Sequence, residues 1–137
     1  MGALRKKSIL VGVTGSIAAY KAAEIVRLLR KKDAIVYPIM TESATRFPAP
    51  LTLQNLASQK VILKLFSGDI GKAEHLSLAE LADACLIAPA TANIISKIAS
   101  GIADDILTTT VLATRAPVLL APAMNNMMYE NPIVQKN

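Results

Sequence analysis

The stretch SILVGVTGSI, residues 8–17, decides the fold of this chain. Its first six residues form a short apolar run, which is typical of a buried strand, and a turn with glycine and serine follows. Downstream, apolar and charged residues fall on opposite helical faces: Ala18, Ala22, Ile25 and Leu29 on one, Lys21, Glu24, Arg27 and Lys31 on the other. The segment therefore predicts a strand, a turn and an amphipathic helix, which is the start of a βαβ unit.

Short apolar runs and helical patterns alternate through the rest of the chain. We expect further strands over residues 34–39, 84–88 and 117–121, and helices over about 50–58, 74–82, 92–99 and 106–113. Strands separated by helices predict an α/β protein with a mostly parallel sheet. Pro38 places the second strand near an edge of that sheet, and the apolar run 118–121 predicts a buried strand.

The composition limits the classes of protein to consider. The 137 residues suffice for one core, so we expect a single domain over residues 1–137. Apolar residues make up 53% of the chain, above the average for soluble domains, and subunit contacts would take up the surplus. The net charge of +5 comes largely from residues 5–7 and 30–32. Aromatic side chains for base stacking are not interleaved with these cations, so no nucleic acid partner is expected.

Cysteine, membrane and metal signals are weak. The single cysteine, Cys85, lies among apolar residues, which predicts a buried, unreactive thiol and a reducing compartment, the cytoplasm. No apolar run approaches the roughly 20 residues of a membrane span, and no signal-peptide pattern is present, so no membrane association is expected. Asp104 and Asp105 lack companion metal ligands at suitable spacing, so we expect helix capping there and no metal site.

Small and polar residues follow three successive predicted strands. The turn 12–17 lets the backbone approach a phosphate, although any strand-to-helix turn favours the same residues. Thr41 and Ser43 can donate hydroxyls to a phosphate or cap a helix, while Thr91 and Asn93 can contact a flat ring or cap a helix. Parallel strands end at one edge of a sheet, so these loops should converge on one crevice. Without a dinucleotide fingerprint, a mononucleotide is favoured over NAD.

A fourth loop, PAMNNMMY at residues 122–129, follows the last predicted strand. Methionine side chains are flexible and polarisable, and two amides add hydrogen-bonding groups, so this loop suits a pocket wall better than a core. The lone histidine, His75, can act as a base near neutral pH. A single histidine is, however, more often a structural group, so this residue type alone leaves both interpretations open.

Four motifs together resemble a known family. The segments GVTGSIAAYK (12–21), His75, APATAN (88–93) and PAMNNMMY (122–129) are similar in order and spacing to those of the homo-oligomeric flavin-containing cysteine decarboxylases, above all the coenzyme A branch. The resemblance implies a Rossmann-like, three-layer αβα flavoprotein domain that binds FMN. It also implies trimers or larger shells of trimers, up to dodecamers, with the flavin at subunit contacts.

The resemblance assigns roles to individual residues. It implies that Gly15, Ser16, Ile17 and Thr41 hold the FMN phosphate, and that Pro89, Ala90, Thr91, Asn93 and Met124 line the rest of the cofactor. His75 would correspond to the active-site histidine. Asn125 would bind the carboxylate of the substrate or its neighbouring amide.

The implied activity is the FMN-dependent decarboxylation of 4′-phosphopantothenoylcysteine to 4′-phosphopantetheine. Flavin first oxidises the thiol carbon to a thioaldehyde, and loss of carbon dioxide then delivers electrons into a conjugated ene-thiolate. In that branch a cysteine on a later flap helps reduce the ene-thiol. The sequence ends at Asn137 before such a segment. We therefore expect this chain to bind FMN, whereas completion of the reaction would depend on the flap cysteine. The alternatives are a peptidyl-cysteine decarboxylase, a flavin prenyltransferase and a non-catalytic flavoprotein regulatory subunit.

Overall fold

The computed structural model describes residues 2–65 and 74–137. The strands are β1 (Ser8–Val13), β2 (Ile35–Met40), β3 (Ala84–Ala90) and β4 (Val118–Pro122). The α-helices are α1 (Lys21–Lys31), α2 (Pro50–Ala57), α3 (Glu74–Leu81), α4 (Ala92–Ala99), α5 (Ile106–Ala113), α6 (Asn126–Tyr129) and α7 (Pro132–Lys136). Two short 3₁₀ helices, η1 (Ile17–Tyr20) and η2 (Ser43–Arg46), follow β1 and β2.

The four strands form one parallel sheet in the order β2-β1-β3-β4. The chain passes from β1 to β2 on one side and then returns to place β3 on the other side of β1. This reversal makes the carboxyl ends of β1 and β3 a topological switch point, where α/β proteins bind ligands. The predicted α/β class with a parallel sheet is confirmed.

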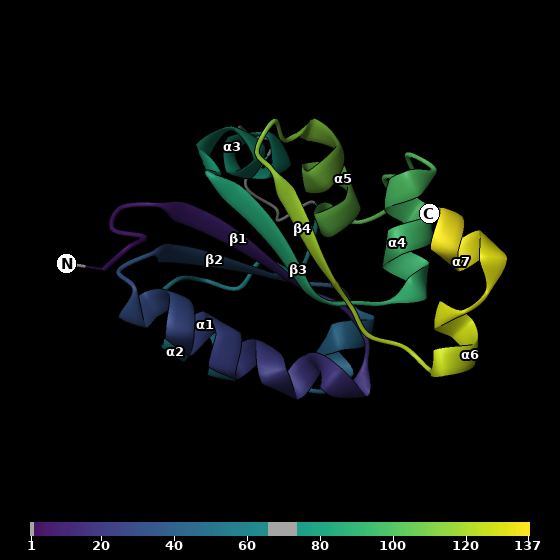
Figure 1. The fold of residues 1–137 in the computed structure, drawn as a ribbon. Helices are drawn as coiled ribbons and strands as arrows, with labels where there is room; N and C mark the ends of the chain where they lie inside the picture. The colour runs from purple at the N-terminus through teal and green to yellow at the C-terminus, as the bar shows by residue number, and fades with distance from the viewer. Residues whose placement is uncertain (1, 66–73) are drawn as a thin grey trace.

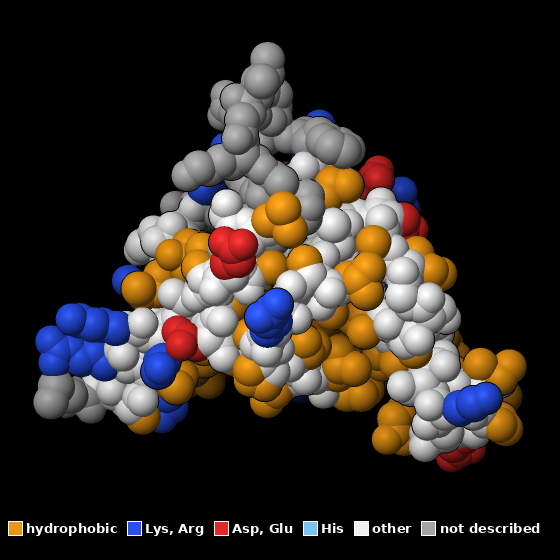
Figure 2. All heavy atoms as spheres, turned by 90° about the horizontal axis from the view of Figure 1, so that it is seen from above, with side chains coloured by type: hydrophobic (Ala, Val, Ile, Leu, Met, Phe, Trp, Pro, Cys, Tyr) orange, Lys and Arg blue, Asp and Glu red, His pale blue; other side chains and the backbone are white. Residues whose placement is uncertain are grey.

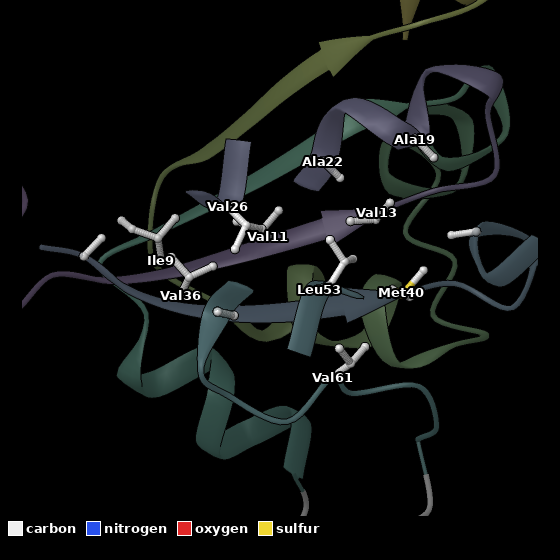
Figure 3. Packing of buried hydrophobic residues seen from close by; sticks show 13 residues of the cluster. Ile9, Val11, Val13, Ala19, Ala22, Val26, Val36, Met40, Leu53 and Val61 are labelled. Carbon is white, nitrogen blue, oxygen red and sulfur yellow. The ribbon is translucent and has the colours of Figure 1, made fainter. Parts of the chain in front are cut away.

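Helices cover both faces of the sheet, giving three layers (Figure 1). Helices α1 and α2 pack on one face, and α3, α4 and α5 contribute to the core on the other. Side chains alternate along β1 accordingly, with Val11 in the first core cluster and Leu10 in the second. Figure 3 shows the first cluster between the sheet and the pair α1 and α2, where Val26 and Leu53 point toward the strands.

The first helical segment differs from the expected pattern by one position. It starts as η1, with about 3 residues per turn, before α1 continues with the wider α-helical turn. The tighter first turn rotates the buried side of the helix. Ala19 and Val26 are therefore buried in place of Ala18 and Ile25, while Ala22 is buried as expected.

Pro38 lies in a terminal strand, as its residue type predicts. Its strand, β2, is the end member of the sheet order, and Pro38 pairs in register with Val11. Beyond β2 there is a single parallel bridge to Ile62, whose N–H donates to the Pro38 carbonyl at 3.0 Å. A missing N–H is tolerated here because the outer side of β2 carries little ladder.

The expectation of a buried last strand is wrong for the described chain. All five residues of β4 are exposed, including Leu119 at 53%. The physical reason is its place at the other end of the sheet order, where it pairs with β3 and, among the described residues, no helix packs extensively against it. An apolar run distinguishes a strand from a loop but does not say whether both faces of that strand are covered.

The two basic runs lie away from the carboxyl ends of the strands. The runs 5–7 and 30–32 are brought together because the Leu4 N–H donates to the Lys32 carbonyl at 3.0 Å, at the amino ends of β1 and β2. Figure 2 shows the Lys and Arg side chains concentrated at that corner of the molecule, on the left. Within residues 2–65 and 74–137, no helix has the length and apolar character needed to cross a membrane.

Candidate functional site

A cavity of about 660 Å³ lies at the carboxyl ends of β1, β2 and β3. Loops after these three strands form one wall, with Thr14, Gly15, Thr41, Glu42, Ser43, Thr91 and Asn93. Residues 63–65, α4 and the start of α5 form the other, including Ile94, Lys97, Asp104, Asp105 and Ile106. The predicted convergence of three strand-end loops on one crevice is confirmed, and the crevice is at the switch point between β1 and β3.

The turn after β1 lies directly against the segment after β2. A Cβ at Gly15 would be only 2.5 Å from the Cβ of Ser43, so this close approach requires glycine. Ser16 caps η1, its Oγ accepting a hydrogen bond from the Ala18 N–H at 3.1 Å. Ile17 begins η1 with its side chain 84% exposed, and the first N–H groups of a helix have no carbonyl partner within that helix.

Thr41 contacts the turn of η2 and also faces the cavity, and its role toward a phosphate stays a prediction. Its Oγ1 accepts a hydrogen bond from the Ala44 N–H at 3.3 Å, which stabilises the turn of η2, and the residue also lines the cavity. Its own N–H donates to the Val13 carbonyl at 3.1 Å, which joins the ends of β1 and β2. Ser43 lines the cavity as the first residue of η2.

The end of β3 and the residue that follows it present a small, mostly buried backbone to the switch point. Pro89 and Ala90 are buried, and Thr91 caps α4 by accepting a hydrogen bond from the Ile94 N–H at 3.2 Å. Asn93, in the first turn of α4, is exposed and lines the cavity. The capping role of Thr91 is therefore confirmed, and it leaves the residue on the cavity wall.

The loop after β4 lies beside this site but does not line the cavity of the single chain. Its link to β3 is the Ala123 N–H, which donates to the Ala90 carbonyl at 3.0 Å. Met124 packs partly buried against the second core cluster, and Asn125 is exposed. The Asn125 Oδ1 accepts a hydrogen bond from the Met127 N–H at 2.8 Å, capping α6, so its Nδ2 is the end of the amide that can face a ligand.

His75 belongs to α3, but its side chain lies outside the described part of the structure. Its predicted role therefore stays a prediction. Cys85 is fully buried within β3, and burial raises the pKa of its thiol to about 11. The expectation of a buried thiol is confirmed, and its low reactivity stays a prediction.

Sequence reasoning did not single out a charged pair on the cavity wall. The Lys97 Nζ lies 2.8 Å from the Asp104 Oδ2, joining α4 to the segment before α5. The hydrogen bond from Lys97 lowers the pKa of the Asp104 carboxyl. The signal in the sequence is that Lys97 follows Asn93 by one helical turn and so faces the same side. Asp105 caps α5 in a capping box with Thr108, which confirms the capping expectation.

The comparisons with known proteins agree with this geometry. A family model described as Flavoprotein matches residues 2–137, and the chain belongs to that family. It is 49% identical over 133 residues to the coenzyme A biosynthesis bifunctional protein CoaBC of Borreliella burgdorferi, covering 97% of this chain and 34% of that protein. The identity to CoaBC of Haemophilus influenzae is 47% over 135 residues, covering 98% of this chain and 34% of that protein. The chain thus spans about a third of the length of these curated relatives.

Two solved structures show the same fold. The FMN-dependent cysteine decarboxylase SpaF aligns with a TM-score of 0.91 and 35% identity, covering 98% of this chain and 78% of that one. A PPC decarboxylase mutant complexed with pantothenoylaminoethenethiol aligns with a TM-score of 0.83 and 30% identity, covering 96% and 75%. The predicted Rossmann-like flavoprotein fold is therefore confirmed.

Proposed function

We propose that residues 1–137 form a single FMN-binding domain that decarboxylates 4′-phosphopantothenoylcysteine in coenzyme A biosynthesis. The observation that carries the proposal is the cavity at the β1 and β3 switch point, lined by strand-end hydroxyls in a chain of the Flavoprotein family. Ligands of α/β sheets collect at this position. The names of the CoaBC relatives and of the PPC decarboxylase structure support this choice of substrate.

The residues present fit a phosphate-bearing flavin nucleotide. A volume of about 660 Å³ lies within the ordinary range for cofactor-sized pockets. The close approach of Gly15 to Ser43 keeps the turn free of side-chain bulk, and the Ser16 hydroxyl, whose oxygen accepts from the Ala18 N–H, can donate its proton to an anion. In this proposal Gly15, Ser16, Ile17 and Thr41 hold the phosphate, and Pro89, Ala90, Thr91, Asn93 and Met124 contact the rest of the cofactor.

FMN supplies the two-electron chemistry that makes decarboxylation of a cysteinyl group feasible, while the protein binds and orients the substrate. Asn125 suits the substrate carboxylate because its Oδ1 is occupied by the Met127 N–H and its Nδ2 can donate. A neutral donor orients the carboxylate without the strong charge stabilisation that would oppose loss of carbon dioxide. His75 is the proposed base, with its backbone in α3.

We further propose a homo-oligomer, a trimer or a dodecamer built from trimers. Support comes from apolar side chains on the loops of the site, with Ile17 84% and Met127 81% exposed, and from the exposed strand β4. Exposed apolar surface of this kind marks contacts between chains. An oligomer would also bring another chain near Asn125, which the single chain leaves outside its own cavity.

A decarboxylase of a different acyl-cysteine, such as a peptide ending in cysteine, is the second candidate. SpaF, named an FMN-dependent cysteine decarboxylase, aligns with a higher TM-score and identity than the PPC decarboxylase structure. The SpaF and PPC decarboxylase structures share this fold, so the choice between the two substrates depends on turnover measurements.

The test begins with an absorbance spectrum of the purified protein and mass identification of any chromophore released by heat. We expect FMN near one per chain, followed by release of carbon dioxide from 4′-phosphopantothenoylcysteine. Release of carbon dioxide only from a peptidyl-cysteine would favour the second candidate. A protein that is purified without a chromophore and does not bind added FMN would contradict both candidates. His75→Asn should retain FMN and lose decarboxylation, so an active variant would overturn the assignment of the base.

A further inference from the structure

The carboxyl ends of β1 and β3 are joined by one buried side chain, that of Thr14. Thr14 is 2% exposed, and its Oγ1 donates a hydrogen bond to the Pro89 carbonyl at 2.5 Å. The same oxygen accepts a hydrogen bond from the Thr91 N–H at 3.2 Å. One hydroxyl therefore satisfies an acceptor and a donor on either side of Ala90, the last residue of β3.

This side chain acts where the backbone pairing of the two strands stops. The register between β1 and β3 runs from Ile9 opposite Ala84 to Gly12 opposite Ile87, and the pairing of β3 with β4 shifts between Ile87 and Ala90. Pro89 has no N–H to continue a ladder. In the described part of the chain, the Thr14 hydroxyl is thus the link between β1 and the loop that carries the cavity residues.

The other neighbours of this loop are held by backbone hydrogen bonds. The Ala90 carbonyl accepts from the Ala123 N–H at 3.0 Å, and the end of β1 is tied to β2 by the Thr41 N–H and the Val13 carbonyl at 3.1 Å. Within residues 2–65 and 74–137, the contact toward β1 is the one that depends on a side chain. A substitution at position 14 can therefore change the position of the loop without breaking the ladders of the sheet.

We infer that Thr14 is a positioning residue, whose hydroxyl sets where Thr91 and Asn93 stand in the cavity and so the affinity for FMN. This inference rests on the proposed FMN site. Thr91 is the N-cap of α4 and Asn93 lies in its first turn, both within four residues of Pro89. If the segment loses its contacts with Thr14 and shifts, both residues shift with it. Burial strengthens the dependence because a buried Pro89 carbonyl and a partly buried Thr91 N–H left without partners favour a shifted loop that regains them.

The variants are chosen to separate the hydroxyl from the packing. Thr14→Val keeps the shape and removes both hydrogen bonds, whereas Thr14→Ser keeps the hydroxyl and removes a methyl group. Thr110→Val is the matched control, because Thr110 is also fully buried and its Oγ1 donates to the Ile106 carbonyl at 2.6 Å within α5. All measurements are made on the full chain at a temperature where far-ultraviolet circular dichroism shows every variant folded.

The first measurement is FMN release from the holoprotein on serial dilution, followed by recovery of flavin fluorescence. We expect Thr14→Val to bind FMN about tenfold more weakly, and Thr14→Ser to stay within about threefold of wild type. Thr110→Val should retain wild-type affinity. Equal affinity of Thr14→Val and wild type, or equal weakening by Thr14→Val and Thr110→Val, would overturn the inference.

The second measurement does not need flavin. Hydrogen exchange of peptides covering residues 88–93 should be faster in Thr14→Val than in wild type or Thr14→Ser, because the Thr91 N–H loses its acceptor. Unchanged exchange would overturn the inference. If the wild type binds no FMN, the proposed function fails, while this exchange comparison still decides whether Thr14 positions the loop.

Discussion

Gly15 and Ser43 touch across the ends of β1 and β2, since a Cβ on Gly15 would lie 2.5 Å from the Ser43 Cβ and 3.2 Å from the Ser43 carbonyl carbon. The two contacts involve backbone as well as side chain, so Ser43 cannot give way by changing rotamer alone. This contact closes the cavity wall between the turn after β1 and η2.

We expect Gly15→Ala to weaken FMN binding by at least about fivefold, because overpacking of this size costs about 1–3 kcal/mol and shifts the wall that faces the ligand. The assay of FMN release on serial dilution of the holoprotein measures this loss of affinity. Gly12→Ala is the control, because its Cβ would meet the Leu107 Cδ1 at 2.6 Å in the core between β1 and α5. If Gly15→Ala binds FMN as wild type does, the turn is not part of the cofactor site.

Leu53→Ala should lower the free energy of unfolding by about 2–5 kcal/mol, since it opens a cavity under α2 at a fully buried position. Leu51→Ala, in the same helix at 63% exposure, should change it by less than about 0.5 kcal/mol. Urea unfolding followed by circular dichroism compares the two. Equal losses would mean that α2 is packed on both sides in solution.

The ion pair of Lys97 and Asp104 predicts a dependence of stability on pH. Lys97 holds the pKa of Asp104 below its ordinary value of 3.8, so the pair stabilises the folded state above that pH and the gain is lost as pH falls through the lower folded-state pKa. Asp104→Asn should therefore lower the melting temperature slightly at pH 7, and by less as the pH falls below 3.8. Salt should reduce the difference at pH 7, because both side chains are partly exposed. A difference that stays constant from pH 7 to pH 3 would contradict the pairing.

Cys85 should resist thiol reagents in the folded protein. Its raised pKa, about 11 against an ordinary 9.0, lowers the thiolate fraction at pH 8 by about 100-fold, and full burial blocks access. The same shift means that the contribution of the neutral Cys85 thiol to the free energy of unfolding is fully present below pH 9. This contribution is lost as the pH rises from 9 toward 11. Dithionitrobenzoate at pH 8 should react with Cys85 in denaturant and only very slowly without it. Rapid, stoichiometric reaction of the folded protein would contradict its burial.

Local sequence determined the elements of this protein and several of its caps. The predicted bounds of β1, α4 and α5 are confirmed, because each depends on neighbouring residues: an apolar run for the strand, and capping by Thr91 and Asp105 for the helices. The convergence of the strand-end loops was also predictable, since it follows from the parallel order of strands and helices. The family resemblance added proposed roles for individual residues, all of which stay predictions.

Tertiary structure alone decided which individual side chains meet between segments that are distant in the sequence. Thr14 meets Pro89 and Thr91 across more than seventy intervening residues, and Lys97 reaches Asp104 only because α4 turns back toward α5. The exposure of β4 and the place of Asn125 outside the cavity likewise depend on where the helix layers end. Strands and caps are set by interactions between near neighbours, whereas contacts between distant segments depend on sheet order and packing, which no local pattern encodes.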